Sequence, residues 1–365
     1  MILSLYIMRR FVSMVARVFL VFFGILVLID MIEQLRRFSA SAIGIDQALW
    51  LAVLNVPETL YRVLPLIMIM ASIALFLGLA RSSELVVVRA AGRSGLRFLA
   101  APVLAALVIG AVAVAVLNPI VAATIKGYSD LRGRYGLGGD SALSVADSGL
   151  WLRQGGAEGQ TVIQALRTNP DGTELFGATF ITFGPDGLPV SRMQADSARL
   201  EAGAWVLSGA KSWDLASANP ELTSQVTTKG VRLASDLTAD RIRDSFGKPS
   251  AISFWALPTF IAGLERAGFS ARSYRLWFQM ELAQPLLMAA MVLVAAGFTM
   301  RHARFGNTGS MVLLALLAGF ALFFLRNFAQ TLGASGQIPV ALAAWSPPLA
   351  AALMALGLLL HVEDG

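Results

Sequence analysis

The chain has 365 residues, of which 56% are hydrophobic and 14% are charged. A soluble globular protein is typically about 45–50% apolar and about 25% charged, so this composition excludes a single water-soluble domain and indicates a membrane protein. The formal net charge is +6, but no basic module with interspersed aromatic residues accompanies it, so nucleic acid is not an expected partner.

Six apolar stretches are each long enough to cross a hydrocarbon core of about 30 Å as a helix of roughly 20 residues. They are residues 11–32, 60–80, 97–118, 276–300, 309–331 and 341–361. A shorter apolar stretch ends at Pro57, just before the second span, and predicts a separate interfacial helix over residues 48–56. No small-residue cleavage site directly follows the first stretch, which therefore predicts an uncleaved helix.

Arginines in the short connections predict the orientation. They gather near the N-terminus, between spans two and three, and between spans four and five. Cytoplasmic loops carry such an excess of basic residues, so both termini are predicted to lie in the cytoplasm. Arg36 and Arg37 follow the first span and lie on the opposite side, against this trend.

Residues 121–273 differ from the flanking regions. Their apolar runs are short, turn sequences recur, and hydrophobic residues alternate with polar ones, as in 149–153, 178–183 and 203–208. This pattern predicts an all-β sandwich or jelly-roll-like domain, which the orientation places outside the cytoplasm. Residues 253–269 predict an amphipathic helix before span four. The predicted organisation is therefore three spans over 1–120, the β domain over 121–273, and three spans over 274–365.

Enzymatic signatures are absent from the sequence. It contains no nucleotide-binding P-loop, nucleophile elbow or zinc-protease motif. It has no cysteine and two histidines, which excludes disulfides and a cysteine- or histidine-rich metal centre. If the chain takes part in ATP-driven transport, a separate subunit must hydrolyse the ATP.

The connection between spans two and three predicts a short cytoplasmic helix over residues 82–93. Ser82 or Ser83 can cap its N-terminus, Glu84 is favourable in its first turn, and Gly92 follows its end. From these features alone, two interpretations stay open. The helix is either a simple interfacial hairpin or a knob that docks into a cytoplasmic partner.

This connection also carries a resemblance. Residues 83–92 read Ser-Glu-Leu-Val-Val-x-x-Ala-x-Gly, which resembles the coupling-helix motif of the lipopolysaccharide-export ABC permease family, the LptF/LptG type. Residues 30–37 resemble the G-type subunit of that family more than its F-type partner, and Gln284-Pro285 matches a further family feature. The order of six spans with a β domain after the third also fits, so the resemblance covers nearly the whole chain.

The resemblance implies a transport subunit. Such a permease pairs with an F-type permease, and the two sit on a cytoplasmic ATPase dimer that binds ATP and Mg, so no cofactor is expected in this chain. Lipopolysaccharide enters the cavity between the permeases from the surrounding membrane lipid. The β domains then pass it to a periplasmic bridge protein made of similar jelly-roll units.

Two groups of residues acquire implied roles from this resemblance. Arg36 and Arg37 correspond to a basic pair at the mouth of the lipid cavity, where guanidinium groups suit the phosphates and carboxylates of lipopolysaccharide. An interfacial anchor for the helix end is the alternative role for this pair. The expected contacts to the ATPase are Ser83, Glu84, Leu85, Arg89 and Gly92.

One prediction comes from the residues and not from the resemblance. Glu281 lies early in span four and Arg326 lies late in span five, so both sit at similar depth below the outer membrane face. Because a lone charge inside a membrane is costly, we expect these two to form an intramembrane ion pair. The pair is interpreted as a structural latch, with a gate as the alternative.

Other functions are weighed against transport. A membrane-anchored envelope enzyme or an assembly scaffold would act through its periplasmic β domain, but Asp140, Asp147 and Asp186 are scattered and do not form a catalytic set. A lipoprotein exporter would place its soluble domain after the first span. A proton-coupled transporter would carry ionisable residues near the middle of the membrane, and none is found there.

Overall fold

The fold is described from a computed structural model. It describes residues 2–37, 44–82, 84, 95–134, 143–146, 149–156, 159–169, 172–184, 186–201, 203–217, 219–227, 230–235, 237–238, 242, 248–266, 269–300 and 308–364. The chain divides into two compact units. The helical unit comprises Met1–Tyr135, Ser250–Trp255 and Arg275–Gly365, and the β unit comprises Gly136–Pro249 and Ala256–Tyr274.

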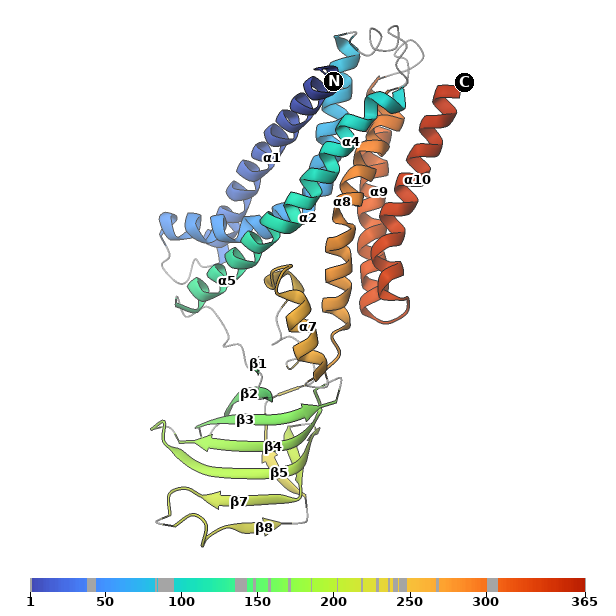
Figure 1. Cartoon of the computed structure of the whole chain (residues 1–365). Coiled ribbons are helices and arrows are strands. Elements are labelled where there is room, and N and C mark those ends of the chain that lie inside the picture. Colours follow the sequence, from blue (N-terminus) through green and yellow to red (C-terminus); the bar gives the residue numbers. More distant parts are fainter. Residues whose placement is uncertain are drawn as a thin grey trace. The chain divides into compact units, whose positions relative to one another are not determined.

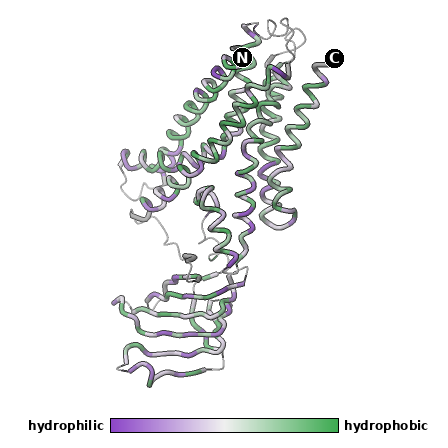
Figure 2. Tube along the Cα trace, viewed as in Figure 1, coloured by the Kyte–Doolittle hydropathy of each residue, from purple (hydrophilic) through white to green (hydrophobic). Residues whose placement is uncertain are grey.

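Within the described residues, six helical segments are long and apolar enough to cross a membrane (Figures 1 and 2). The third of them is formed by α4, a π-helical turn η2 and α5, which follow one another without a break. The bounds are α1 (Ile2–Arg37), α2 (Ile45–Arg81), α4 (Gly95–Val112), η2 (Ala113–Leu117), α5 (Asn118–Arg134), α8 (Arg272–Thr299), α9 (Thr308–Ala334) and α10 (Val340–Asp364). The predicted fold class, six membrane-spanning helices with a separate β domain between the third and fourth, is confirmed.

Helix α2 differs from the sequence prediction. Residues 48–56 are not a separate interfacial helix but the first part of α2, which runs through Pro57 and Pro65. A proline lacks one backbone donor, yet helices buried among other helices tolerate it because neighbouring groups satisfy the freed carbonyl. The third helical segment likewise continues through η2 and α5 to Arg134, beyond the predicted end of span three at residue 118.

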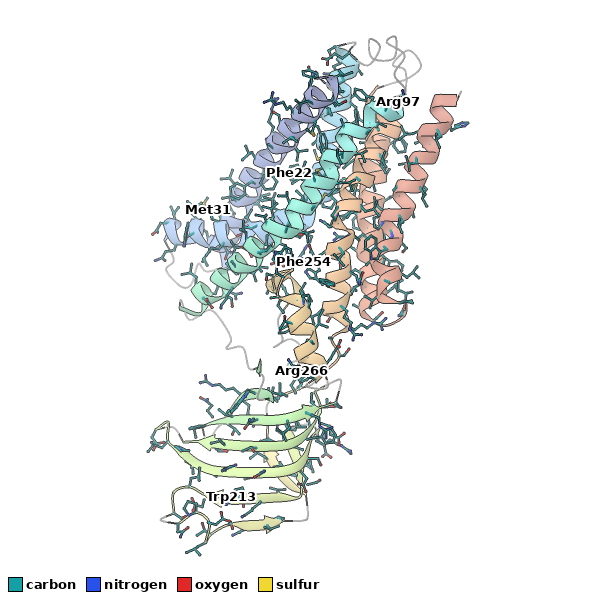
Figure 3. All side chains as sticks on the ribbon, viewed as in Figure 1. Phe22, Met31, Arg97, Trp213, Phe254 and Arg266 are labelled. Atoms are coloured by element: carbon teal, nitrogen blue, oxygen red, sulfur yellow. The ribbon has the colours of Figure 1, made fainter. Side chains whose placement is uncertain are left out.

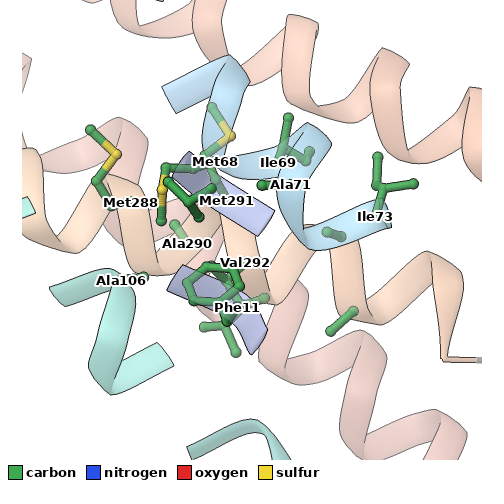
Figure 4. Packing of buried hydrophobic residues seen from close by; sticks show 14 of the residues in the cluster. Phe11, Met68, Ile69, Ala71, Ile73, Ala106, Met288, Ala290, Met291 and Val292 are labelled. Atoms are coloured by element: carbon green, nitrogen blue, oxygen red, sulfur yellow. The ribbon is translucent and has the colours of Figure 1, made fainter. Parts of the chain in front are cut away.

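The core of the helical unit is built from large and small apolar side chains of several helices. Phe11 of α1, Met68 of α2, Ala106 of α4 and Met288 of α8 belong to one buried cluster (Figure 4). Helix α8 is the most enclosed. In its most apolar stretch of 18 residues 78% of the residues are buried, compared with 6% in α1 and 17% in α9. Helix α8 is therefore the central helix, whereas few of the apolar residues of α1 and α9 are fully buried.

A close approach of α4 and α8 occurs at Gly110. A β-carbon at this position would lie 2.5 Å from the α-carbon of Pro285 and 3.1 Å from its nitrogen. Backbone atoms cannot move aside as a flexible side chain does, so only glycine fits there. Pro285 of the Gln284-Pro285 sequence thus has a packing role, because it lies against Gly110, where any residue larger than glycine would keep the two helices apart.

The β unit contains an antiparallel sheet in which strands that follow one another in the chain are mostly neighbours. Its described strands are β1 (Leu143–Ala146), β2 (Gly149–Gly156), β3 (Gly159–Thr168), β4 (Glu174–Phe183), β5 (Pro189–Glu201), β6 (Ala204–Ser208), β7 (Ala210–Asp214), β8 (Gln225–Thr227) and β9 (Val231–Ala234). Strand β5 pairs with β4 along one edge and with β6 and β7 along the other. Strands β9 and β8 then pair with β6 and β7.

The buried face of this sheet changes partway along the strands. Buried positions within a strand are normally two apart, but at one level they are three apart in β3, β4 and β5 and across the junction of β6 and β7. The affected pairs are Ala165 and Thr168, Leu175 and Ala178, Ala195 and Ala198, and Leu207 and Ala210. Gly177 and Gly209 lie at this level with φ of 61° and 64°, a conformation that glycine adopts without strain. The two glycines therefore allow the sheet to bend there.

A short amphipathic helix belongs to the β unit. Helix α7 (Leu257–Arg266) buries Leu257 and Leu264, and Phe260 packs at 5.0 Å from Tyr274. Its position matches the amphipathic helix predicted within residues 253–269. A single 3-10 turn, η3 (Pro249–Ala251), precedes it.

Candidate functional site

The predicted coupling region is described at Glu84 and its surroundings. Arg10 of α1 donates to the Glu84 carboxylate at 2.7 Å, and Ser82 donates to the same Oε1 atom at 2.7 Å. Arg10 also donates to the hydroxyl of Tyr6 at 2.8 Å. The residue expected to contact an ATPase is thus tied to the N-terminal part of α1. The other expected contacts, Ser83, Leu85, Arg89 and Gly92, lie outside the described residues.

The charge of Glu84 is stabilised by these donors. The hydrogen bond from Arg10, followed by that from Ser82, lowers the pKa of the Glu84 carboxyl below its ordinary value. Both Arg10 and Glu84 keep about a third of their side-chain surface exposed. The pair can therefore fix the junction of α1 and α2 while the carboxylate stays accessible to a partner.

The predicted lipid-contacting arginines lie at the end of α1. Arg36 donates to Glu33 at 2.9 Å, and 79% of its side chain is exposed. The backbone of Arg37 ends the helix, but its side chain lies outside the described part. Arg36, Glu33 and Asp30 line a half-open cavity of about 520 Å³ between α1 and α2, together with Leu26, Ile29, Ile32 and Val56.

Asp30 is held in place by neutral donors from two helices. Asn55 of α2 donates to Oδ1 at 2.8 Å, and Gln34 of α1 donates to Oδ2 at 3.1 Å. Gln34 is 1% exposed and also donates to Tyr128 of α5 at 3.1 Å. This network fixes the cavity wall and joins α1, α2 and α5.

Glu281 and Arg326 are both buried in the helical unit, with 1% and 9% exposure. Their side chains have different hydrogen-bond partners: Tyr61 of α2 donates to Glu281, and Arg326 donates to Gln284 of α8 at 3.2 Å. A direct ion pair is not among the contacts of these two described residues. The opposite charges still attract each other at longer range.

Asn118 extends this buried group towards the returning chain. Its Oδ1 accepts the backbone N–H of Phe254 at 2.7 Å, and its side chain lies beside Tyr61 and Glu281. Phe254, which is labelled in Figure 3, also stacks on Phe278 of α8, with ring centroids 5.2 Å apart. The segment 250–255, which interrupts the β unit between residues 249 and 256, is therefore held within the helical unit.

Two more contacts hold segment 250–255. Trp255 donates from Nε1 to the carbonyl of Ala115 at 3.1 Å, and Ser250 donates to Glu58 at 3.3 Å. Ala115 lies in the π-helical turn η2. π-helical turns shift the backbone pairing and occur often at functional sites. No sequence pattern indicated this contact of Trp255 or the π turn.

Comparison with known proteins identifies the family. The family described as "Lipopolysaccharide export system permease LptF/LptG" matches residues 5–361. The LptG permease protein of Escherichia coli K12 is 25% identical over 341 residues, which cover 93% of this chain and 91% of that protein. The LptG permease protein of Haemophilus influenzae is 22% identical over 346 residues, 93% of each chain. The chain therefore belongs to the LptF/LptG family of lipopolysaccharide export system permeases, and it resembles LptG.

Proposed function

We propose that this chain is one of two paired permeases in an ATP-driven transporter that extracts lipopolysaccharide from the inner membrane. An F-type permease is the partner, and a separate ATPase dimer binds ATP and Mg on the cytoplasmic side. Both termini lie in the cytoplasm. The β unit lies in the periplasm and passes lipopolysaccharide to a bridge protein of similar β units.

The observation that carries this proposal is the exposed apolar residues of α1 and α9 in a chain that a permease family matches over residues 5–361. In α1, Leu20, Leu28 and Ile32 are more than half exposed, and in α9, Phe324 and Phe328 are more than 60% exposed. Membrane lipid can cover such apolar faces. The faces of α1 and α9 can also contact a second permease, and they can line an apolar cavity for acyl chains between the two permeases.

Glu84 supports ATPase coupling in a specific way. Its partner Arg10 belongs to α1, so a force on the 82–93 segment is passed to α1 as well as to α2. Because α1 also carries Arg36 and one wall of the cavity between α1 and α2 near its other end, the contact with the ATPase and this cavity share one helix. This arrangement would let ATP-driven movement alter the cavity.

The proposal is tested by native mass spectrometry of the complex purified gently through a tag on this chain. We expect a second permease, two copies of an ATPase and a bound lipid A species. A homo-oligomer without ATPase and glycolipid would overturn the proposal. In a reconstituted system, Glu84→Gln should lower lipopolysaccharide release, whereas Glu174→Gln in the β unit, which also removes a carboxylate from an ion pair, serves as the matched control.

A further inference from the structure

The third membrane-spanning segment changes its backbone pairing at η2, just before a proline. In an α-helix, the N–H of residue 119 would donate to the carbonyl of Ala115, four residues earlier. Pro119 has no N–H, and its ring crowds that same carbonyl. The N–H of Asn118 reaches back five residues, to the carbonyl of Ala113, which is the π-helical pairing. Pro119 therefore deprives the carbonyl of Ala115 of the donor that an α-helix would give it.

A donor for this carbonyl comes from the segment 250–255, far away in the sequence. Nε1 of Trp255 donates to the carbonyl of Ala115 at 3.1 Å. Beside this bond, Oδ1 of Asn118 accepts the backbone N–H of Phe254 at 2.7 Å. Two consecutive residues of the segment 250–255 thus bind the π turn and the residue that follows it.

We propose that the segment 250–255 is a strap that holds a proline hinge at η2 and thereby sets the angle between α4 and α5. Helices bend where a proline removes a backbone hydrogen bond, and the bond from Trp255 restricts this bending. Proline alone does not produce a π turn, since α2 continues as an α-helix through Pro57 and Pro65. The inference concerns the conformation of this chain and goes beyond the proposed function, because it does not depend on the cargo or on the ATPase.

The helices on the two sides of the hinge pack against different neighbours. Before the hinge, α4 closely approaches α8, because a β-carbon at Gly110 would lie 2.5 Å from the α-carbon of Pro285. After the hinge, α5 is bonded to α1, because Gln34 of α1 donates to the hydroxyl of Tyr128 at 3.1 Å. A change of the hinge angle would therefore move α1 relative to α8.

The strap is held by contacts that can be broken. Trp255 is 65% exposed, so water can replace the indole hydrogen bond at little cost. Phe254 stacks on Phe278 of α8, with ring centroids 5.2 Å apart, which ties the strap to α8 as well as to the hinge. Both ends of the strap continue into the β unit, at Pro249 and Ala256. A movement of the β unit that pulls on the chain therefore reaches the hinge through the strap.

The hinge is measured by pulsed electron paramagnetic resonance on the full-length chain in nanodiscs. The sequence has no cysteine, so Leu104→Cys in α4 and Ser129→Cys in α5 provide two unique labelling sites, both at exposed positions. The sites are about 25 residues apart, or roughly 37 Å along a straight helix. We expect a narrow distribution of the distance between the labels in this parent. The distribution should be broader in Trp255→Phe, which removes the indole donor and keeps an aromatic ring.

Two further variants identify the cause of the broadening. Trp345→Phe is the matched control, because Trp345 of α10 also donates an indole hydrogen bond, to Gln279 of α8 at 3.0 Å. It should leave the distribution unchanged. Pro119→Ala restores the backbone N–H that can donate to Ala115, and alanine favours the helix. In the Pro119→Ala background, Trp255→Phe should therefore no longer broaden the distribution, so the two substitutions should be coupled.

Broadening by Trp255→Phe that is lost in the Pro119→Ala background supports the strap. The inference is overturned if Trp255→Phe leaves the distribution unchanged, if Trp345→Phe broadens it equally, or if the broadening persists in the Pro119→Ala background. If Pro119→Ala does not fold, the comparison of the two tryptophan variants decides. The measurement needs neither lipopolysaccharide nor an ATPase, so its failure leaves the proposed function intact. Equally, a complex without ATPase and glycolipid would overturn the proposed function and not the strap.

Discussion

At the scale of single residues, the helical unit satisfies its buried charges with neutral partners. Glu281 accepts from Tyr61, and Arg326 donates to Gln284. The sequence indicated that two buried opposite charges at equal depth belong together. It did not indicate that a tyrosine and a glutamine stand beside them, because neutral polar residues in a span carry no signal of which neighbour they face.

The hydroxyl of Tyr61 is expected to contribute strongly to stability. In Tyr61→Phe the buried Glu281 carboxylate loses a donor, and an unsatisfied buried group costs about 1–3 kcal/mol. Thermal unfolding in detergent micelles should show this loss. The control is Tyr6→Phe, whose hydroxyl lies on a side chain that is 47% exposed and where water replaces the lost bond. Equal effects of both variants would contradict the assigned role of Tyr61.

Glu84 should give the stability of the protein a pH dependence with a defined sign. The hydrogen bond from Arg10 lowers the folded-state pKa of Glu84 below the ordinary value of 4.5. The stabilisation is therefore present above pH 4.5 and is lost as the pH falls through the lowered pKa. Because the pair is partly exposed, we expect less than about 1 kcal/mol.

The measurement compares wild type and Glu84→Gln by thermal unfolding from pH 7 to pH 3. The wild type should be more stable at pH 7, and the difference should vanish at the acidic end. A stability difference that stays constant over this range would show that the charge of Glu84 does not contribute to stability through its ion pair with Arg10.

At the scale of elements, helix contacts depend on small residues that sequence patterns do not single out. Hydropathy located every span, because about 20 apolar residues are recognisable without knowing their neighbours. It did not reveal that Pro57 lies inside α2 or that Gly110 lies against Pro285. Both facts depend on which helix lies opposite, and periodicity within a single helix carries no such information.

Gly110→Ala is expected to destabilise the contact between α4 and α8. Its β-carbon would lie 2.5 Å from a backbone atom of Pro285, so the helices must separate, at a cost of about 1–3 kcal/mol. Gly357→Ala in α10 is the control, since no atom lies within 4 Å of its β-carbon position and alanine favours the helix. Thermal unfolding should show opposite signs for the two variants, and equal signs would contradict the close contact.

At the scale of the whole molecule, the chain forms two units, and the helical one includes the short segment 250–255. The composition predicted both a helical membrane part and a β domain, because turn-rich alternating sequence contrasts with long apolar runs. The anchoring of the returning chain by Asn118 and the π turn at Ala115 was not predictable. The hydrogen-bond partner of a single asparagine near the end of a span cannot be inferred from a sequence pattern.

Asn118→Ala should release the returning segment while the sheet stays folded. The backbone N–H of Phe254 loses its acceptor, so its hydrogen exchange should become faster. Exchange in β4 and β5 should stay unchanged, because those amides are paired within the sheet. Hydrogen-exchange mass spectrometry of the full chain measures both. Protection of Phe254 that persists in the variant would show that other contacts are sufficient to hold the segment.

The order of strands in the sheet bears on how the protein is made. From β1 to β6 each strand pairs with the next one in the chain, so the contacts of this region join residues close in sequence. Chains with mainly local contacts collapse quickly, without waiting for distant segments. Successive hairpins can therefore form before α8 has been synthesised. The last three spans would then be inserted into the membrane behind a β domain that is already largely folded.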